Sequence, residues 1–238
     1  IFYRSFEDSF KGRWIVSEKD DYNYLNEGHD DHGLLVSKKA RKYAFVKEFD
    51  HNLALKDKTI TLQFEVRLHN GLEYGGSYLK YLQTQHAGWK AKKFDNESPY
   101  SIMFGSDKCG STNKVHFMLK HKNPKNWKYV EHHLNNPSSV PSDKLTHVYT
   151  TLLTPDNELR LLVDDEEKKK ANFLSSEDFE PPLIPAKPIS DPNDKKPEDW
   201  EGGMEITRIV VHAEKTKKKK TKKKKTSNVL VSFKKIGD

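Results

Sequence analysis

The sequence of 238 residues contains a single cysteine, Cys109. One cysteine excludes an internal disulfide framework, a zinc centre built from several thiolates, and CxxC redox chemistry. A lone thiol is compatible with any compartment, so the cysteine content leaves the location open.

Long apolar runs, helical periodicity and catalytic signatures are also missing. No apolar run approaches the ~20 residues needed to span a bilayer, so no membrane anchor is visible in this sequence. No 3.6-residue apolar period persists over three turns. There is no G-x-S-x-G motif, no Cys–His pair with a recognisable context and no phosphate-cradling loop. Composition does not exclude a retaining glycosidase, but no paired Glu on one strand points to one. We therefore expect a binding protein and not an enzyme.

Positive charge is concentrated in one segment. The formal net charge is +7, yet Lys215–Lys225 alone contains nine lysines and two threonines. Without those nine the chain has 33 basic and 35 acidic residues, a net charge of about −2. The body is thus mildly acidic, and no aromatic residue interleaves the lysines to stack on bases. Nucleic acid is therefore not the expected partner.

Alternating apolar residues predict a β-rich fold. Residues 59–68 place five apolar side chains at every second position, as in a half-buried strand. The turn residues Thr154 to Asn157 separate two further predicted strands and indicate a hairpin. These two strands are predicted at residues 147–153 and 158–164, and further strands at 114–120, 33–37 and 78–82. Many short strands joined by turns favour an all-β sandwich.

A change in composition near residue 181 predicts the domain boundaries. Residues 181–200 contain six of the eleven prolines, which cannot take part in regular ladders. We expect a sandwich over residues 1–180, a proline-rich arm over 181–200, and an atypical lysine-rich, disordered tail over 201–238.

Three segments combine aromatic and polar side chains as sugar-binding sites do. In GLEYGGSYLKYL, Tyr78 and Lys80 share one face of a strand, where a ring can cover C–H groups while Lys donates to hydroxyls. SPYSIMFGSDKCG supplies Tyr100 and Met103, and Glu131 follows the HKNPK loop. Each pattern alone is more typical of a half-buried tyrosine, core packing or a solvated carboxylate.

Together these segments resemble the globular lectin domain of the calnexin, calreticulin and calmegin family of endoplasmic-reticulum chaperones. The resemblance runs from about Phe2 to Trp200 and includes residues 144–150, residues 155–157, and DPNDKKPEDW, which is similar to one repeat of the family's P-domain arm. It implies a concanavalin A-like jelly-roll sandwich in the endoplasmic reticulum. It further implies calcium-supported, ATP-independent binding of monoglucosylated N-glycans on unfolded glycoproteins, without catalysis.

The same resemblance implies roles for individual residues. It places the glucose-binding groove at these positions: Tyr78, Lys80, Tyr100, Met103 and Glu131. It places calcium ligands at Ser5 and Asp31, in keeping with the hard oxygen ligands that Ca²⁺ prefers. A protein disulfide isomerase would bind through the arm.

Two departures from the family pattern affect the expected structure. The family joins the cysteine of DKCG to a cysteine before GG, but here that position is Tyr74, so Cys109 lacks a partner. The absent cross-link over ~35 residues removes about 3 kcal/mol of stabilisation. Residues 201–238 match nothing in the family's return segment, which carries a second sugar-binding Glu and a calcium-binding Asp. We therefore expect the sandwich to lack a strand and to leave an edge unpaired.

Other interpretations remain open. One is a glycan-independent holdase that uses exposed apolar surface, and another is a polyanion binder that uses residues 215–225. A truncated product without function is a third. His29 and His32, beside Asp30 and Asp31, would suit a transition metal, but an exposed polar loop explains them equally well.

Overall fold

The computed structural model consists almost entirely of β-strands. It describes residues 15–16, 26–27, 34–36, 41–49, 57–69, 71–83, 89–123, 126–184 and 228–236, with the backbone alone at 26–27, 41 and 228–236. The strands are β1 (Ile15–Val16), β2 (Asn26–Glu27), β3 (Leu34–Leu35), β4 (Arg41–Glu48), β5 (Ile60–Arg67), β6 (Tyr74–Leu82), β7 (Tyr100–Cys109), β8 (Thr112–Lys122), β9 (Tyr129–Leu134), β10 (Thr146–Leu153), β11 (Glu158–Val163), β12 (Glu166–Asn172), β13 (Phe179–Glu180) and β14 (Asn228–Ile236). A short 3₁₀ helix, η1 (Ala91–Lys93), precedes β7.

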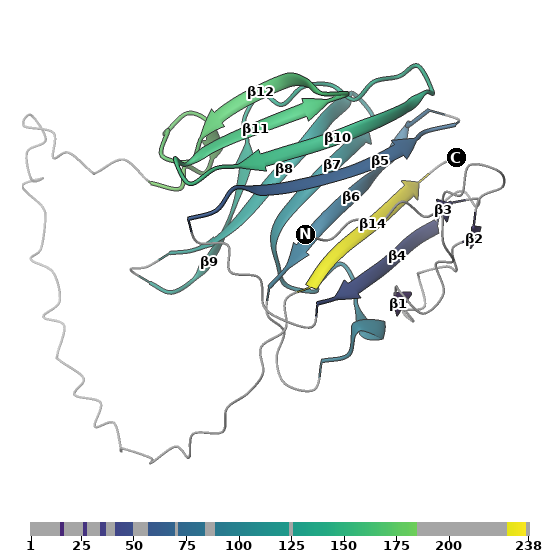
Figure 1. The fold of residues 1–238 in the computed structure, drawn as a ribbon, viewed down its shortest axis with the longest axis horizontal. Coiled ribbons are helices and arrows are strands. Elements are labelled where there is room, and N and C mark those ends of the chain that lie inside the picture. The colour runs from purple at the N-terminus through teal and green to yellow at the C-terminus, as the bar shows by residue number, and fades with distance from the viewer. Residues whose placement is uncertain are drawn as a thin grey trace, which may run out of the picture. The chain divides into compact units, whose positions relative to one another are not determined.

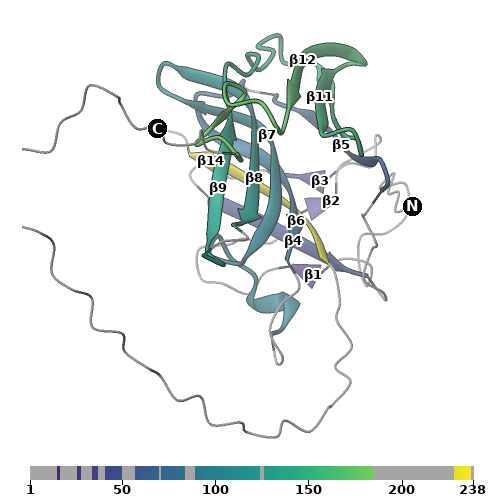
Figure 2. The same ribbon diagram turned by 90° about the vertical axis from the view of Figure 1, so that its left-hand side faces the viewer.

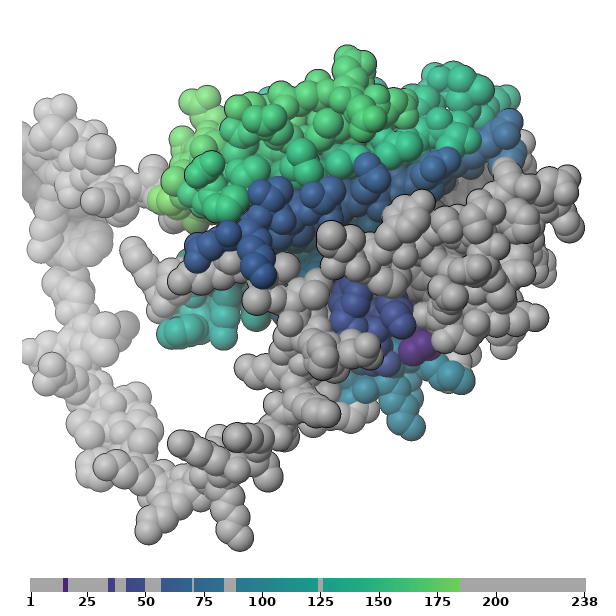
Figure 3. Space-filling model, in the orientation of Figure 1, coloured from purple at the N-terminus to yellow at the C-terminus, as the bar shows by residue number. Residues whose placement is uncertain are grey.

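Two antiparallel sheets form the predicted sandwich. The larger sheet has the strand order β1-β4-β14-β6-β7-β8-β9-β13, and the smaller has the order β12-β11-β10-β5. Figures 1 and 2 show the smaller sheet packed across one face of the larger one. In the space-filling view, β5, β10, β11 and β12 form a continuous layer over that face (Figure 3). A separate two-stranded sheet joins β2 to β3. The all-β prediction is confirmed.

The main core lies between the two sheets. In β5, Leu62 and Phe64 are buried while the residues between them are exposed, which confirms the predicted alternation. Phe64 stacks on Tyr149 of β10, with ring centroids 5.4 Å apart, and meets Phe104 of β7 edge to face at 5.7 Å. These aromatic contacts join the two sheets, since β5 and β10 belong to one and β7 to the other.

A second hydrophobic cluster lies on the other face of the larger sheet. Ala44, Val46 and Leu82 pack there with Phe94, which follows η1, while Trp89 packs against the cluster. We call this side of the larger sheet, turned away from the smaller sheet, the second face. Its apolar cover explains why strands in the middle of this sheet bury residues on both sides.

The C-terminal residues 228–236 correct one prediction. They form β14, which pairs antiparallel with β4 on one side and with β6 on the other. The expectations that residues 201–238 are disordered throughout and that the sandwich lacks a strand here are therefore wrong for this segment. In VLVSFKK, the apolar residues Val229, Val231 and Phe233 stand at every second position, a strand signal that the neighbouring lysine run obscured.

The predicted strands are otherwise found close to their expected places. The hairpin of β10 and β11 closes through Thr154, whose backbone N–H donates to the Glu158 carbonyl at 2.9 Å, and through Asn157, which has a φ of 64°. Strand β12, EEKKKAN, was missed because Ala171 is the only buried residue in it. Charged side chains of this kind protect the edge of a sheet from association with other chains.

The chain divides into two units, residues 1–185 with 225–238 and residues 186–224. The second unit contains the P-domain-like repeat and lies outside the described residues, so the boundaries proposed for the arm stay predictions. Among the described residues no helix is long and apolar enough to cross a membrane.

The register of β6 and β7 generates a prediction about the missing cross-link. Tyr74 lies directly opposite Cys109, which is an exposed free thiol. Directly opposed Cα atoms in an antiparallel pair are about 4.5–5.5 Å apart, within the range for a disulfide. Tyr74→Cys should therefore form this bond and raise the free energy of unfolding by about 3 kcal/mol.

The measurement is urea unfolding with and without reductant, together with a thiol assay. Tyr74→Ser is the matched control, since it removes the same ring and offers no second sulfur. If the oxidised Tyr74→Cys protein were no more stable than its reduced form, the register would not meet the geometry of a disulfide.

Candidate functional site

The residues predicted to bind sugar meet on the second face. β6 and β7 direct alternate residues into the main core, so Tyr78, Lys80 and Met103 lie on the opposite side of the sheet. Lys80 lies directly opposite Met103 in the register of the two strands. Tyr100 begins β7 and donates a hydrogen bond from its hydroxyl to Glu131 of β9. Three strands, β6, β7 and β9, thus bring the five predicted side chains together.

Two glycines determine where the Tyr78 ring lies. A Cβ at Gly76 would stand 2.4 Å from Cε2 of Tyr78 and 2.7 Å from its hydroxyl oxygen, so the ring occupies the space above Gly76. A Cβ at Gly105 would meet the carbonyl oxygen of Ser77 at 1.9 Å, so only glycine allows this close approach of β7 to β6. Tyr78 is half-buried. Burial and the neighbouring Asp107 carboxylate raise the pKa of Tyr78, so its phenol stays protonated.

Lys80 is a buried cation with unused donors. The residue is only 4% exposed, and burial, followed by repulsion from Lys120, lowers the pKa of Lys80 to about 8. Its Nζ lies 5.3 Å from the centre of the Tyr100 ring, a cation–π contact. Among the described residues, no hydrogen bond or ion pair satisfies this ammonium. An ammonium has three N–H donors, and these stay available to a ligand.

Glu131 is, by contrast, a well-compensated anion. Its Oε2 accepts the hydrogen bond from Tyr100 and lies 3.3 Å from Nζ of Lys120. Although partial burial opposes ionisation, the hydrogen bonds from Tyr100 and Lys120 hold the pKa of Glu131 below its ordinary value. Nζ of Lys120 also lies 4.2 Å from the centre of the Tyr100 ring, which is therefore flanked by two lysines. Tyr100 is 5% exposed, and burial followed by the hydrogen bond to Glu131 raises its pKa.

Two histidines continue this polar chain. Nε2 of His133 lies 3.0 Å from Oε1 of Glu131 and donates to it, so in neutral His133 the Nδ1 atom is an acceptor. That Nδ1 lies 3.2 Å from Nε2 of His116, which must then carry the proton between them. The unprotonated Nδ1 of His116 faces Asp107, whose Oδ2 is 3.9 Å away. Burial, followed by the charge of Lys114, lowers the pKa of His116 to about 4.

The sequence did not reveal four members of this chain, which are Asp107, His116, Lys120 and His133. A usable signal was present, because KVHFMLK places His116, Met118 and Lys120 on one side of a strand. The sequence could not show that this side faces Met103 and Glu131, since that depends on the register of β8 with its neighbours. Register is a property of the assembled sheet.

The predicted calcium ligands, Ser5 and Asp31, lie outside the described residues. Within the described ranges, no group of three or more His, Cys, Asp or Glu residues is placed to hold a metal ion. The structure thus neither places nor assembles a cation site, and calcium stays a prediction. The His29 and His32 alternative also lies outside the described residues.

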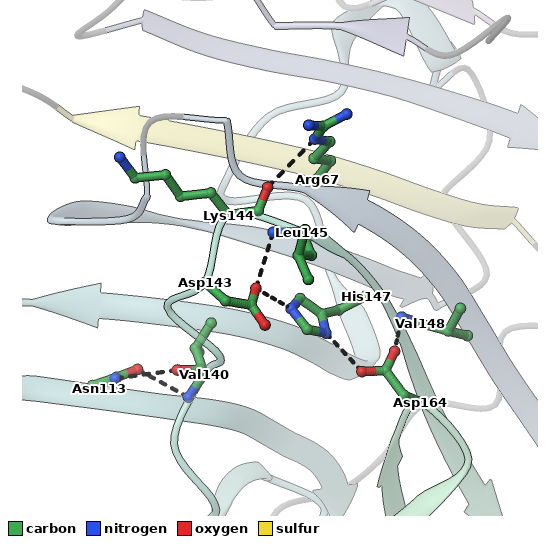
Figure 4. A network of polar contacts seen from close by, with 9 residues as sticks. All are labelled: Arg67, Asn113, Val140, Asp143, Lys144, Leu145, His147, Val148 and Asp164. Carbon is green, nitrogen blue, oxygen red and sulfur yellow. Dashed lines mark hydrogen bonds and ion pairs between the residues drawn. The ribbon is translucent and has the colours of Figure 1, made fainter.

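A second polar network lies at one end of the smaller sheet (Figure 4). His147 stands between two carboxylates, with Nδ1 2.6 Å from Asp164 and Nε2 2.7 Å from Asp143. Burial opposes its protonation, but the two hydrogen-bonded carboxylates raise the pKa of His147. Asp164 also accepts a hydrogen bond from the Val148 backbone N–H at 2.9 Å. The network therefore ties the turn after β11 to the start of β10.

Comparison with known proteins agrees with this architecture. The globular domain of T. cruzi calreticulin superposes with a TM-score of 0.68 at 26% identity, over 94% of this chain and 79% of that one. A calnexin homolog from Glycine max is 70% identical over 211 residues, which cover 87% of this chain and 39% of the relative. Calnexin homolog 1 from Arabidopsis thaliana is 66% identical over 87% of this chain and 40% of the relative. The chain therefore spans about two fifths of the length of these relatives.

The fold is that of a calreticulin-type globular domain. The calreticulin family model matches residues 3–229. The chain belongs to the calreticulin family.

Burial of Lys80 generates a prediction about stability. Because its pKa is about 8 in the folded protein and 10.5 in an unperturbed lysine, the unfolded chain binds this proton more tightly. Keeping the ammonium buried costs the folded state up to about 3 kcal/mol at neutral pH. This cost disappears as the pH rises through about 8 to 10.5, so the free energy of unfolding should rise over that range. Lys80→Met should stabilise the protein near pH 7 and have little effect above about pH 10.

Urea unfolding between about pH 7 and pH 10 measures this difference. Lys122→Met is the control, because Lys122 is exposed on the same sheet, so its loss should not stabilise the protein. A lower stability of Lys80→Met at pH 7 would mean that the ammonium is compensated in the folded protein.

Proposed function

We propose that this chain binds monoglucosylated N-glycans on unfolded glycoproteins, as a calcium-supported lectin chaperone of the endoplasmic reticulum. Binding involves no bond-making, so no catalytic residue is assigned. Membership of the calreticulin family and the fold support the lectin class. Because the chain spans about two fifths of its relatives, the function of a whole relative comes to it only as part of this proposal.

The observation that carries the proposal is the unsatisfied ammonium of Lys80 beside two tyrosines. A buried cation without a partner is costly, and such groups are typical of sites completed by a ligand. Glu131 already accepts hydrogen bonds from Tyr100 and Lys120, so its carboxylate is not free to serve as the counter-ion of a charged ligand. A neutral, hydroxyl-rich ligand such as a hexose accepts from Lys80 and also presents C–H faces to an aromatic ring.

The contacts divide the roles among the residues. Tyr78 is half-buried over Gly76 and covers one face of the sugar, while Lys80 donates to its hydroxyls. Met103, opposite Lys80, packs beneath. Tyr100 is covered by two lysines, so a sugar stacks on its ring only if one of them moves. In the absence of sugar, Tyr100 holds Lys80 and Glu131 in position.

Three parts of the proposal rest on the family alone. They are calcium binding by Ser5 and Asp31, a protein disulfide isomerase bound through the arm, and residence in the endoplasmic reticulum. Calcium prefers hard oxygen ligands, and its binding to the folded state alone would raise the melting temperature.

Titration calorimetry with a glucose-capped mannose oligosaccharide and its deglucosylated form tests the sugar site. The wild-type chain should bind only the capped form, and its affinity should fall as the pH rises through about 8, where Lys80 loses its charge. Lys80→Met should lower the affinity by at least about tenfold at pH 7, because a hydrogen bond from a charged group contributes about 1.5–3 kcal/mol. Equal or absent affinity for the two sugars would reject the lectin function.

The glycan-independent holdase is distinguished by its clients. In that case, capture of an unfolded, unglycosylated protein should survive the double change Tyr78→Ala and Lys80→Ala. For a lectin chaperone, the same double change should abolish capture of glucosylated clients.

Gly76→Ala tests the placement of the Tyr78 ring. The added methyl would occupy the space of that ring and force it to rotate, so affinity for the capped sugar should fall by at least about tenfold. Stability should change by less than about 1 kcal/mol, because a side chain and not backbone must give way. Ser77→Ala is the matched control, since Ser77 points to the other side of β6, and its buried hydroxyl has no hydrogen-bond partner in the described part of the chain. Unchanged sugar affinity in Gly76→Ala would show that the ring position is irrelevant to binding.

A further inference from the structure

The tip of the β8–β9 hairpin presents two large aromatic rings to solvent. Trp127 is 70% exposed and Tyr129 is 54% exposed. We define the hairpin tip as Lys122, Trp127, Lys128 and Tyr129. Figure 1 shows β8 and β9 running out past the ends of β5 and β10 on the left of the molecule. Scattered apolar side chains are ordinary on a surface, but adjacent Trp and Tyr rings at a projecting turn are not.

The backbone at Trp127 adopts a strained, left-handed conformation. Trp127 has a φ of 60°, a left-handed conformation that glycine adopts readily and a bulky aromatic residue rarely does. Its backbone N–H donates to the Asn123 carbonyl at 2.9 Å, and the Asn123 N–H donates to the Lys128 carbonyl at 2.9 Å, so the turn is closed. Glycine would suit this position better for folding. The indole therefore contributes something other than stability.

The tip is also cationic. Nζ of Lys122 lies 5.1 Å from the centre of the Trp127 ring and 5.8 Å from that of Tyr129. Neither Lys122 nor Lys128 has a carboxylate within ion-pairing distance in the described part of the chain. In the sequence, residues 120–130 contain four lysines and no Asp or Glu. The next acidic residue, Glu131, pairs with Lys120 and His133.

This combination fits the headgroup region of an anionic bilayer. Trp and Tyr prefer that depth because each ring has an apolar body and a polar edge. Lysines beside them are attracted to acidic headgroups and extend their charge toward water. A peptide partner would need a groove or a free strand edge, whereas the N–H groups of Asn123 and Trp127 in this turn already donate to backbone carbonyls. We propose that the hairpin tip docks the domain on anionic phospholipid membranes.

Vesicle binding by the full chain tests the proposal. Sedimentation with vesicles of phosphatidylcholine mixed with phosphatidylserine should recover the wild-type protein, and vesicles of phosphatidylcholine alone should recover much less. Trp127→Gly should weaken binding to the mixed vesicles by at least about tenfold, with a melting temperature no lower than wild type, because glycine relieves the positive φ. Replacing Lys122 and Lys128 by Gln should weaken binding and reduce its salt dependence. Leu145→Ser, which removes an equally exposed apolar residue elsewhere, should have no effect.

The lysine run at residues 215–225 is also able to attract acidic vesicles, so a second readout separates the two sources. Lipids brominated in their acyl chains quench tryptophan only when the indole inserts. Wild-type fluorescence should be quenched more than that of Trp127→Gly, since the run contains no tryptophan. Unchanged vesicle affinity in Trp127→Gly, or equal quenching of the two proteins, would overturn the proposal. So would binding to polyglutamate without binding to vesicles, which would indicate an acidic peptide partner.

Discussion

The antiparallel register of β6 with β7 is the constraint on which both the core and the candidate site depend. It places Phe104 between the sheets and Met103 opposite Lys80 on the second face. A slip of one residue would exchange these two faces and bring a lysine toward the core. Gly105 protects the register, because any side chain there would collide with the backbone of Ser77. Folding and site geometry are thus specified by the same strand pair.

On the second face, the charge of Glu131 is compensated by neighbouring side chains much better than the charge of Lys80. The carboxylate of Glu131 receives hydrogen bonds from Tyr100, Lys120 and His133, so it is held ionised and fixed in place. The ammonium of Lys80 is more deeply buried and, among the described residues, makes a cation–π contact with Tyr100 but no hydrogen bond or ion pair. An uncompensated Lys80 lowers the stability of the fold, while the nearby Glu131 is hydrogen-bonded. Such a difference in compensation is expected of a binding site.

Strands β8 and β9 connect the proposed sugar site with the proposed membrane contact. In the register of β8 and β9, the pair Lys120 and Glu131 is followed by the pair Lys122 and Tyr129. Alternation leaves both pairs on the second face, the first inside a polar network and the second open to solvent. The hairpin therefore places the proposed ligand site close to the proposed surface contact. A bilayer docked at the tip would lie beside the sugar site.

Sequence alone predicted the fold class and the hairpin of β10 and β11, because alternation and turn chemistry are local properties. The five residues of the candidate sugar site were indicated by the resemblance to the family. The sequence did not predict β4, β7 or β9 as strands. It also missed β12, whose side chains are charged, and β14, whose pattern lies next to a lysine run. It also missed His116, His133 and Lys120, which join the site through strand register, and the lowered pKa of Lys80, which arises from burial by residues distant in sequence. These features required the tertiary structure, because register, burial and proximity arise only when separate strands pack together.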